Sequence, residues 1–164
     1  MIAVADAGPI HYLCLLRQAH VLSELFGRVV LPSAVADAEL AAAETPLVVR
    51  EVIKDRPDWL DVAEPSDNAT VRVAATLGLG ERQAIALAVE LGADWLLCDD
   101  LAARREAEHA DLRVIGTLGI LRRAALNGLL DFHSALDELI TQTNFRHSPQ
   151  LIARVRDDFD RETR

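Results

Sequence analysis

The residues of this sequence with the clearest potential for chemistry are acids at the ends of predicted secondary-structure elements. Asp99 and Asp100 follow the apolar run 95–98, which is typical of a parallel strand buried on both faces. Glu81 lies in the first turn of the preceding helical segment, which Gly92 closes. Because a helix that leads into a parallel strand runs antiparallel to it, Glu81 and the two aspartates are expected at the same sheet edge. That edge is where open α/β proteins bind ligands.

Two further segments are predicted to bring carboxylates to this edge. Asp6 directly follows a short apolar strand at residues 2–5, so it too lies at the carboxyl end of a strand. Glu39 lies on the helix that follows the second predicted strand, and Asp37 is the alternative on the same helix. The sequence therefore predicts that separate segments of the chain deliver acids to one place.

Acids gathered at close range favour a bound cation. Carboxylates repel one another, and removal from water raises their pKa values further, so such a group is costly unless a cation occupies it. Ligands that are all oxygen select hard ions, above all Mg²⁺ or Mn²⁺. The predicted metal ligands are Asp6, Glu81, Asp99 and Asp100. Such a site is suited to in-line attack on a phosphodiester. No strand-to-helix turn carries a Walker or Rossmann glycine pattern, so a nucleotide cradle is not expected.

Strands and helices alternate along the sequence, which predicts an α/β fold with three layers, α/β/α, around a mainly parallel sheet of four to five strands. The predicted strands are 2–5, 28–31, 95–98 and 112–115, with 59–63 as a short edge strand. The predicted helices are 9–16, 21–26, a helix that Pro32 and Ser33 open, 47–55, 66–77, 81–91, 101–110 and 118–126. Two amphipathic helices, at about 130–143 and 149–161, finish the chain.

Length and composition favour a single domain over residues 1–164, with the helices of residues 130–164 as an extension. A chain of 164 residues with 51% hydrophobic residues can bury a full core. Its net charge of −9 counts against a protein that simply coats nucleic acid, but not against an enzyme whose acids hold a cation. No apolar run is long enough to span a membrane, the N-terminus lacks the basic start of a signal peptide, and the two cysteines form no disulfide or metal pattern. A cytoplasmic protein is expected.

Four motifs, taken in order, resemble those of PIN-domain proteins: VADAGPI, GLGERQAIALAVELGAD, LLCDDLAARR and VIGTLGIL. More closely, they are similar to the branch of predicted nucleic-acid-binding PIN proteins that is allied to the VapC toxins. The resemblance covers Ile2 to Leu126 and extends into the segment FRHSPQLI near the C-terminus. It implies a Mg²⁺- or Mn²⁺-dependent ribonuclease that cleaves RNA. It also implies a toxin paired with a small antitoxin protein, and a homodimer.

The resemblance also implies which acids are catalytic. The first strand-end aspartate of the family matches Asp6, its mid-helix glutamate matches Glu39, and its third acid matches Glu81. The acid that closes the later strand matches Asp100, or Asp99 if the alignment slips by one residue. The predicted catalytic set is therefore Asp6, Glu39, Glu81 and Asp100. The sequence departs from the family pattern at two places. Cys98 replaces the usual Thr or Ser, and the glutamate register near residue 38 is shifted.

Three other residues are predicted to contact the substrate. Arg104 and Arg105 follow the paired aspartates and are suited to phosphate, and Thr117 stands at the next strand-to-helix turn. Each has a structural alternative. A hydroxyl at such a turn usually caps the helix, and Arg104 is one helical turn from Glu108, an exposed ion pair.

The acids have structural alternatives as well. Asp6 at a helix start is a common N-cap, and Glu81 in a first turn is favoured by the helix dipole. Asp99 is a candidate cap for the helix that starts at Leu101, which would leave Asp100 facing the site.

Two other classes of function were weighed against the nuclease. One is a catalytically silent PIN-like domain that binds protein or nucleic acid, which fits the pI of about 4.9. The other is a receiver-like phosphoacceptor. A receiver needs an acidic pair after its first strand and a lysine after its last, whereas this chain has a single aspartate there and its only lysine is Lys54.

Overall fold

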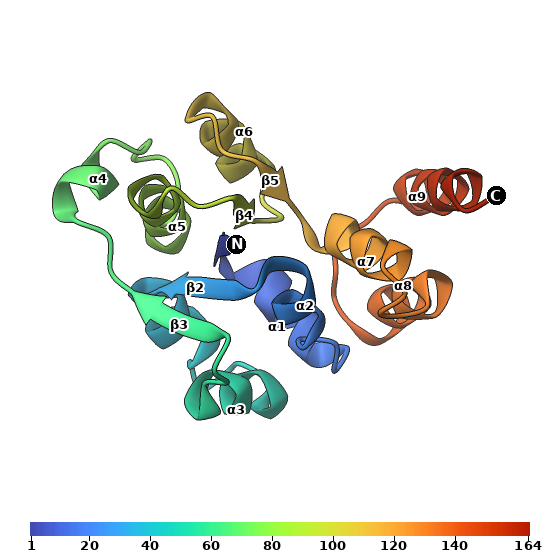
Figure 1. Cartoon of the computed structure of the whole chain (residues 1–164). Coiled ribbons are helices and arrows are strands. Elements are labelled where there is room, and N and C mark those ends of the chain that lie inside the picture. Colours follow the sequence, from blue (N-terminus) through green and yellow to red (C-terminus); the bar gives the residue numbers. More distant parts are fainter. The chain divides into compact units, whose positions relative to one another are not determined.

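Five apolar segments form one parallel sheet in the first part of the chain. In the computed structural model the strands stand in the order β3-β2-β1-β4-β5, and every neighbouring pair is parallel (Figure 1). They are β1 (Ile2–Ala5), β2 (Arg28–Pro32), β3 (Leu60–Ala63), β4 (Trp95–Leu97) and β5 (Val114–Ile115). The structure describes residues 1–164, with the side chain of Val71 excepted. The predicted α/β class and parallel sheet are confirmed, with five strands.

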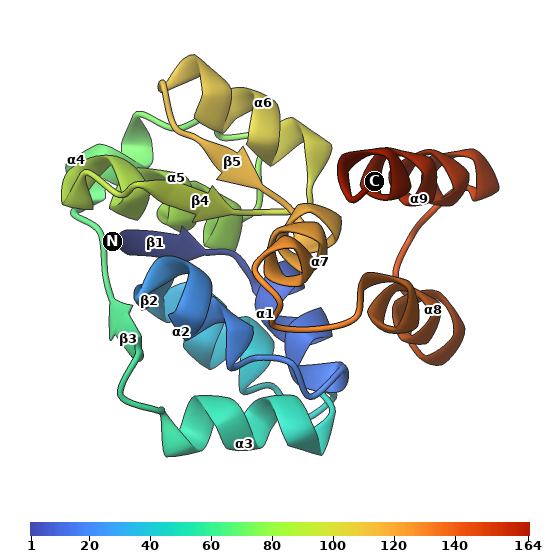
Figure 2. The same cartoon turned by 45° about the vertical axis from the view of Figure 1, so that its right-hand side comes forward.

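Helices cover both faces of this sheet. Figures 1 and 2 show α1, α2 and α3 on one side and α4, α5 and α6 on the other. Their bounds are α1 (Ala7–Leu15), α2 (Val21–Phe26), α3 (Leu47–Asp55), α4 (Asp67–Val71), α5 (Leu79–Leu91) and α6 (Leu101–His109). A seventh helical segment, η1 (Ala34–Leu40), is a π-helix between β2 and α3. The layers are those of the predicted α/β/α arrangement.

The strand order reverses direction at β1 and β4. The chain leaves β1 toward β2 on one side of the sheet and leaves β4 toward β5 on the other. Because parallel crossovers are right-handed, the helices that follow these two neighbouring strands lie on opposite faces. The carboxyl ends of β1 and β4 therefore border a crevice, which is the usual ligand site of open α/β sheets. Asp6 directly follows β1, and Asp99 and Asp100 lie near the end of β4.

One buried core lies between the sheet and the helices α5 and α6. It joins Val4, Val30 and Leu96 of the sheet to the apolar residues of α5. The α5 residues from Ala84 to Ala88 are all buried, whereas Val89 and Leu91 are 52% and 41% exposed. The predicted burial therefore holds for the middle of α5 and not for its end. Because α5 leads into the parallel strand β4, it runs antiparallel to the strands, and its first turn lies at the carboxyl edge of the sheet.

Several predicted helix ends are confirmed. Gly92 ends α5 in the left-handed conformation (φ 57°), and the Ser66 hydroxyl accepts a hydrogen bond from Ala69 N–H at the start of α4. One prediction was wrong. The helix predicted over 66–77 ends at Val71. The helix predicted after Ser33 is present, as a π-helix over Ala34–Leu40.

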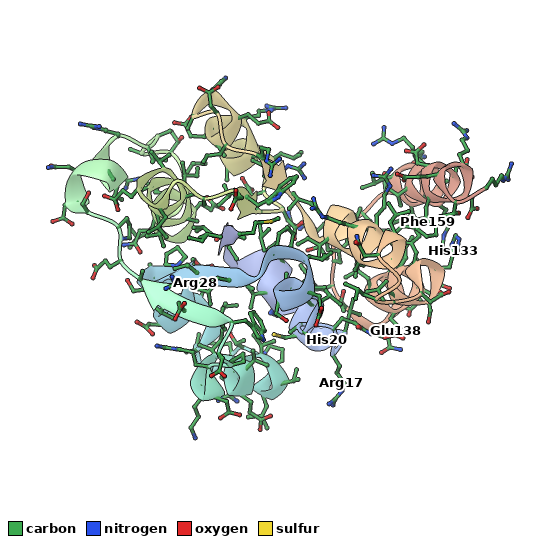
Figure 3. The ribbon with its side chains drawn as sticks, viewed as in Figure 1. Arg17, His20, Arg28, His133, Glu138 and Phe159 are labelled. Carbon is green, nitrogen blue, oxygen red and sulfur yellow. The ribbon has the colours of Figure 1, made fainter. Side chains whose placement is uncertain are left out.

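Residues 118–164 form a second compact unit, separate from residues 1–117. It contains nearly all of α7 (Thr117–Leu126), together with α8 (Phe132–Gln142) and α9 (Pro149–Glu162). The rings of Phe132 and Phe159 stack with centroids 4.4 Å apart, and His133 lies beside Phe159 between α8 and α9 (Figure 3). Ser148 and Pro149 start α9 as predicted. Within the described residues, no helix has the length and apolar character needed to cross a membrane.

Candidate functional site

Asp6 stands at the carboxyl end of β1, beside the end of β4. Its backbone N–H donates to Leu97 O at 2.9 Å, which extends the pairing of the two strands by one residue. Asp6 is only 8% exposed. It occupies the N-cap position of α1, but its side chain makes no capping hydrogen bond. Its Oδ1 atom is buried and has no hydrogen-bond partner in the described part of the chain. Helix capping therefore does not account for this side chain.

Three other carboxylates act on Asp6. Burial, which is the largest cause, and the negative charges of Glu39, Glu81 and Asp100 together raise the pKa of Asp6 to about 7. The Ala7 N–H acts in the opposite direction and lowers it in part. These acids come from η1, from the first turn of α5 and from the segment after β4. We call Asp6, Glu39, Glu81 and Asp100 the acidic group, because their charges influence one another across the crevice.

The choice between Glu39 and Asp37 is decided by the π-helix η1. The carboxylate of Glu39 lies against α5 at Gly80. Burial raises the pKa of Glu39, and the charge of Glu81 raises it further. Both residues are exposed overall, but Asp37 is not among the carboxylates that raise the pKa of Asp6. Of the two alternatives, Glu39 is the one that the fold brings to the acidic group.

Glu81 and Asp100 each also stabilise a helix. Glu81 Oε2 accepts a hydrogen bond of 2.9 Å from Gly78 N–H at the start of α5. Asp100 Oδ1 accepts one of 2.9 Å from Ala103 N–H and so caps α6. The structural alternative for Glu81, an acid of the first helical turn, thus holds in this structure. Both acids also raise the pKa of Asp6. The cap of α6 is Asp100 and not Asp99, so the alternative that assigned the cap to Asp99 was wrong.

Asp99 is bound by a different partner. Its Oδ1 accepts from Thr117 N–H and its Oδ2 accepts from Thr117 Oγ1, each at 2.6 Å. Thr117 is fully buried. Burial raises the pKa of Asp99, and the two bonds from Thr117 and the charge of Arg104 lower it in part. In this structure the two side chains are hydrogen-bonded to each other. The role of Asp99 as a metal ligand and that of Thr117 as a substrate contact therefore stay predictions.

Cys98 lies directly beneath Asp6. Its Sγ atom is 3.9 Å from Asp6 Oδ2 and 3.9 Å from Asp100 O, and the residue is buried. Burial raises the pKa of the Cys98 thiol, and the charge of Asp6 adds to this. Cys14 is buried as well. Both cysteines are buried thiols, as expected, and Cys98 offers Asp6 only a weak hydrogen-bond donor.

The arrangement and the chemistry of their oxygen atoms decide whether these residues suit a divalent cation. Among the described residues, no three His, Cys, Asp or Glu side chains are arranged so that they could hold a metal ion. The donor chemistry nevertheless fits, because the acidic group offers only carboxylate oxygens, which Mg²⁺ and Mn²⁺ prefer. Asp6 Oδ1 is also a buried anionic oxygen without a partner, and such an atom is costly unless a cation satisfies it.

The two predicted phosphate ligands differ in their surroundings. Arg104 is half-buried, and its Nη1 lies 3.1 Å from the position that a Cβ on Gly116 would occupy. This places its guanidinium next to Asp99, whose pKa it lowers. Arg105 is exposed. The ion pairs found in the described residues do not include one between Arg104 and Glu108, the structural alternative for this arginine.

Three glycines contact the acids, and the sequence interpretation missed them. A Cβ on Gly8 would lie 2.9 Å from Asp99 Oδ2, and one on Gly116 would lie 2.7 Å from Asp99 Oδ1. Gly80 is in a similar position toward Glu39. A usable signal was present at Gly80, since a glycine within a helix is unfavourable unless packing requires it.

Residues 2–161 match the family model described as DUF3368, a PIN domain. Among solved structures, the chain is similar to a PilT N-terminus domain protein from the hyperthermophilic archaeon Sulfolobus solfataricus P2. The identity is 15%, the match covers 90% of this chain and 100% of that chain, and the TM-score is 0.45. No curated protein sequence matches the chain.

Proposed function

Because the chain belongs to the PIN-domain family, whose members are generally nucleases, we propose that it is a Mg²⁺- or Mn²⁺-dependent endoribonuclease. The family gives the general class, a nuclease with a nucleic-acid substrate. The proposal adds the metal, the RNA substrate and the residues.

The observation that supports the proposal most is the state of Asp6. A buried carboxylate oxygen without a hydrogen-bond partner is rare in folded proteins, because the loss of water is not compensated. In this chain three further carboxylates raise the pKa of the same group. A protein gains nothing in stability from such an arrangement by itself, whereas a cation bound there would satisfy the oxygen and reduce the repulsion.

The acidic group would hold the cation, with Asp99 as the alternative to Asp100. A bound Mg²⁺ or Mn²⁺ supplies an activated water and neutralises charge on a phosphodiester. The protein's own groups do the rest. Asp6 and its neighbours, which come from separate elements, would hold the cation and through it set where the phosphate is bound. Arg104, half-buried beside the crevice, would bind a phosphate oxygen, and the exposed Arg105 is a second candidate.

The direct test is cleavage of single-stranded RNA by the purified protein with Mn²⁺ or Mg²⁺. We expect EDTA to abolish cleavage. Asp6→Asn and Asp100→Asn should each lower the rate by roughly 100-fold or more, since even outer-shell partners of a metal are typically worth 10–100-fold. Asparagine keeps the shape of both side chains and the cap of α6, so loss of activity would not reflect unfolding.

Asp37→Asn is the matched control for this test. It removes one charge from the same short helix as Glu39, but at an exposed position outside the acidic group. We expect this variant to keep the wild-type rate. Full cleavage in EDTA, or wild-type rates in both the Asp6 and Asp100 variants, would refute the metal mechanism.

We further propose, from the family resemblance, that the protein is the toxin of a toxin–antitoxin pair. A gene for a small DNA-binding protein directly beside the gene for this chain would support this. Growth arrest on expression of the wild type, but not of Asp6→Asn, would support it independently.

A second candidate function is a catalytically silent PIN-like module that binds protein or nucleic acid. It is favoured by one observation, that no three described side chains stand ready to hold a metal ion. Calorimetric titration with Mn²⁺ separates the two. A folded protein that binds no Mn²⁺ and cleaves no RNA would be such a module.

A further inference from the structure

The carboxylate of Glu39 occupies the space in which a side chain at position 80 would lie. A Cβ placed on Gly80 would overlap with Glu39 Oε1 and would lie 3.2 Å from Glu39 Cδ. It would also lie 3.1 Å from Val35 Cγ2. Gly80 is buried, although it lies in the first turn of α5. Because glycine has no side chain, α5 leaves a space at position 80, and the Glu39 carboxylate fills this space.

The backbone of Gly80 gives no other reason for a glycine. The positive-φ glycines are Gly27, Gly92 and Gly128, and Gly80 is not among them. Within a helix, glycine is less favourable than alanine by roughly 0.5–1 kcal/mol. Gly80 lowers helix stability, and the backbone conformation does not require a glycine. The remaining reason for a glycine at this position is the space that it leaves free.

The π-helix η1 is held in place on both sides of Glu39. Ala41 N–H donates to Ala36 O at 3.0 Å, an i to i+5 bond that makes this turn wider than an α-helix. At the start of η1, Ala34 N–H donates to Gln83 Oε1 of α5 at 3.3 Å. After its end, Thr45 Oγ1 donates to Glu39 O at 2.8 Å. The backbone that carries Glu39 is therefore tied down while its side chain reaches α5.

We propose that Gly80 is a positioning residue, whose missing side chain seats the Glu39 carboxylate beside Glu81 and Asp6 and so completes the acidic group. The charges are consistent with this seat, since Glu81 acts on Glu39 and both act on Asp6. The effect of Gly80 on metal binding rests on the proposed function. The placement of the Glu39 carboxylate by Gly80 does not.

The test begins with Gly80→Ala. The new methyl group would meet mainly the far end of a flexible side chain, so we expect the Glu39 carboxylate to move and the fold to remain. The dissociation constant for Mn²⁺ should rise about tenfold or more, the range expected when a group that orients a metal ligand is lost. The melting temperature without metal should not fall, because alanine favours the helix.

A double-mutant cycle with Glu39→Ala shows whether Gly80 acts through Glu39. In the Glu39→Ala background, Gly80→Ala should cause no further loss of Mn²⁺ binding, since the ligand it displaces is already absent. Without metal, Gly80→Ala should raise the melting temperature more in this background than in the wild type, because the methyl group then enters an empty space.

Gly78→Ala is the matched control, two residues away at the start of the same helix. A Cβ there would find Glu81 Oε2 at 3.5 Å, an ordinary contact, and the backbone (φ −62°) suits alanine. Its Mn²⁺ response should equal that of the wild type. Additive melting temperatures in the cycle, or an equal loss of Mn²⁺ binding with and without Glu39, would overturn the proposal. If the wild type shows no Mn²⁺ response, the proposed function fails, and the metal-free melting temperatures still decide whether Gly80 seats Glu39.

Discussion

Burial and three neighbouring carboxylates raise the pKa of Asp6 to about 7, from 3.8 for a free aspartate. Between these values the folded protein binds a proton that the unfolded chain does not, so the stability of the metal-free protein falls as pH rises through this interval. We expect Asp6→Asn to remove this loss and to make the metal-free protein more stable than the wild type at pH 8. The effect is on the order of a few kcal/mol at most.

The measurement is the difference between the wild type and Asp6→Asn in thermal melts at pH 5.5 and pH 8. The difference is needed because other groups titrate too. Glu39 and Asp99 have raised pKa values and act in the same direction, whereas burial lowers the pKa of His11, which acts in the opposite direction. If Asp6 were only a helix cap, asparagine would cap α1 equally well. The difference in melting temperature between the wild type and the variant would then be the same at both pH values.

Mn²⁺ should reverse the penalty at Asp6, because a metal ligand must be deprotonated. A cation bound only by the folded state stabilises it by about 2.7 kcal/mol at a hundredfold excess over Kd, or roughly 5–10 °C in Tm for a chain of this length. This shift should grow as pH rises through about 7 and shrink in Asp6→Asn. An undiminished Mn²⁺ shift in that variant would mean that Asp6 is not a ligand.

The segment after β4 is joined to the start of α7 by one pair of side chains. Asp99 accepts both polar hydrogens of the buried Thr117, and Gly8 and Gly116 leave room for its carboxylate. Asp99→Ala should therefore destabilise the protein by about 1–3 kcal/mol, because it leaves a buried N–H and hydroxyl unsatisfied. Urea denaturation measures this loss as a change in midpoint at constant slope.

Thr117→Val provides the test that the two side chains act together. Valine keeps the volume of threonine and removes only the hydroxyl, so part of the cost of Asp99→Ala should disappear in the double variant. Asp100→Ala is the comparison for a simple cap, with an expected loss of about 1 kcal/mol. Full additivity of the Asp99 and Thr117 variants would show that their hydrogen bonds contribute little.

The C-terminal helices bear on the assembly of the whole molecule. Phe132, Leu136 and Leu139 of α8 are buried, whereas Leu151 and Val155 of α9 remain partly exposed. The predicted homodimer therefore has an apolar stripe on α9 available. We expect light scattering at tens of micromolar to give twice the 17.9 kDa of the chain. Leu151→Glu should lower that mass, while Gln150→Glu, at an exposed neighbouring position, should not. A monomeric wild type at these concentrations would reject the prediction.

The sequence alone determined the elements whose signals are local. The apolar residues of α5, the left-handed Gly92 at its end, and Ser148 with Pro149 at the start of α9 act over a few residues each, so the chain shows them directly. The carboxyl-edge position of Asp6 also followed, because a residue after a parallel strand can lie at only one edge of the sheet.

Only the tertiary structure decided which side chains meet at that edge. Glu39 and Asp37 are two residues apart on η1 and so point in different directions, and the packing of η1 on α5 places the Glu39 carboxylate against Gly80. Asp99 and Asp100 likewise take different partners, one bound by Thr117 and the other capping α6. These outcomes depend on contacts between residues far apart in the chain. The local sequence carries no record of such contacts, apart from a glycine where a helix would favour alanine.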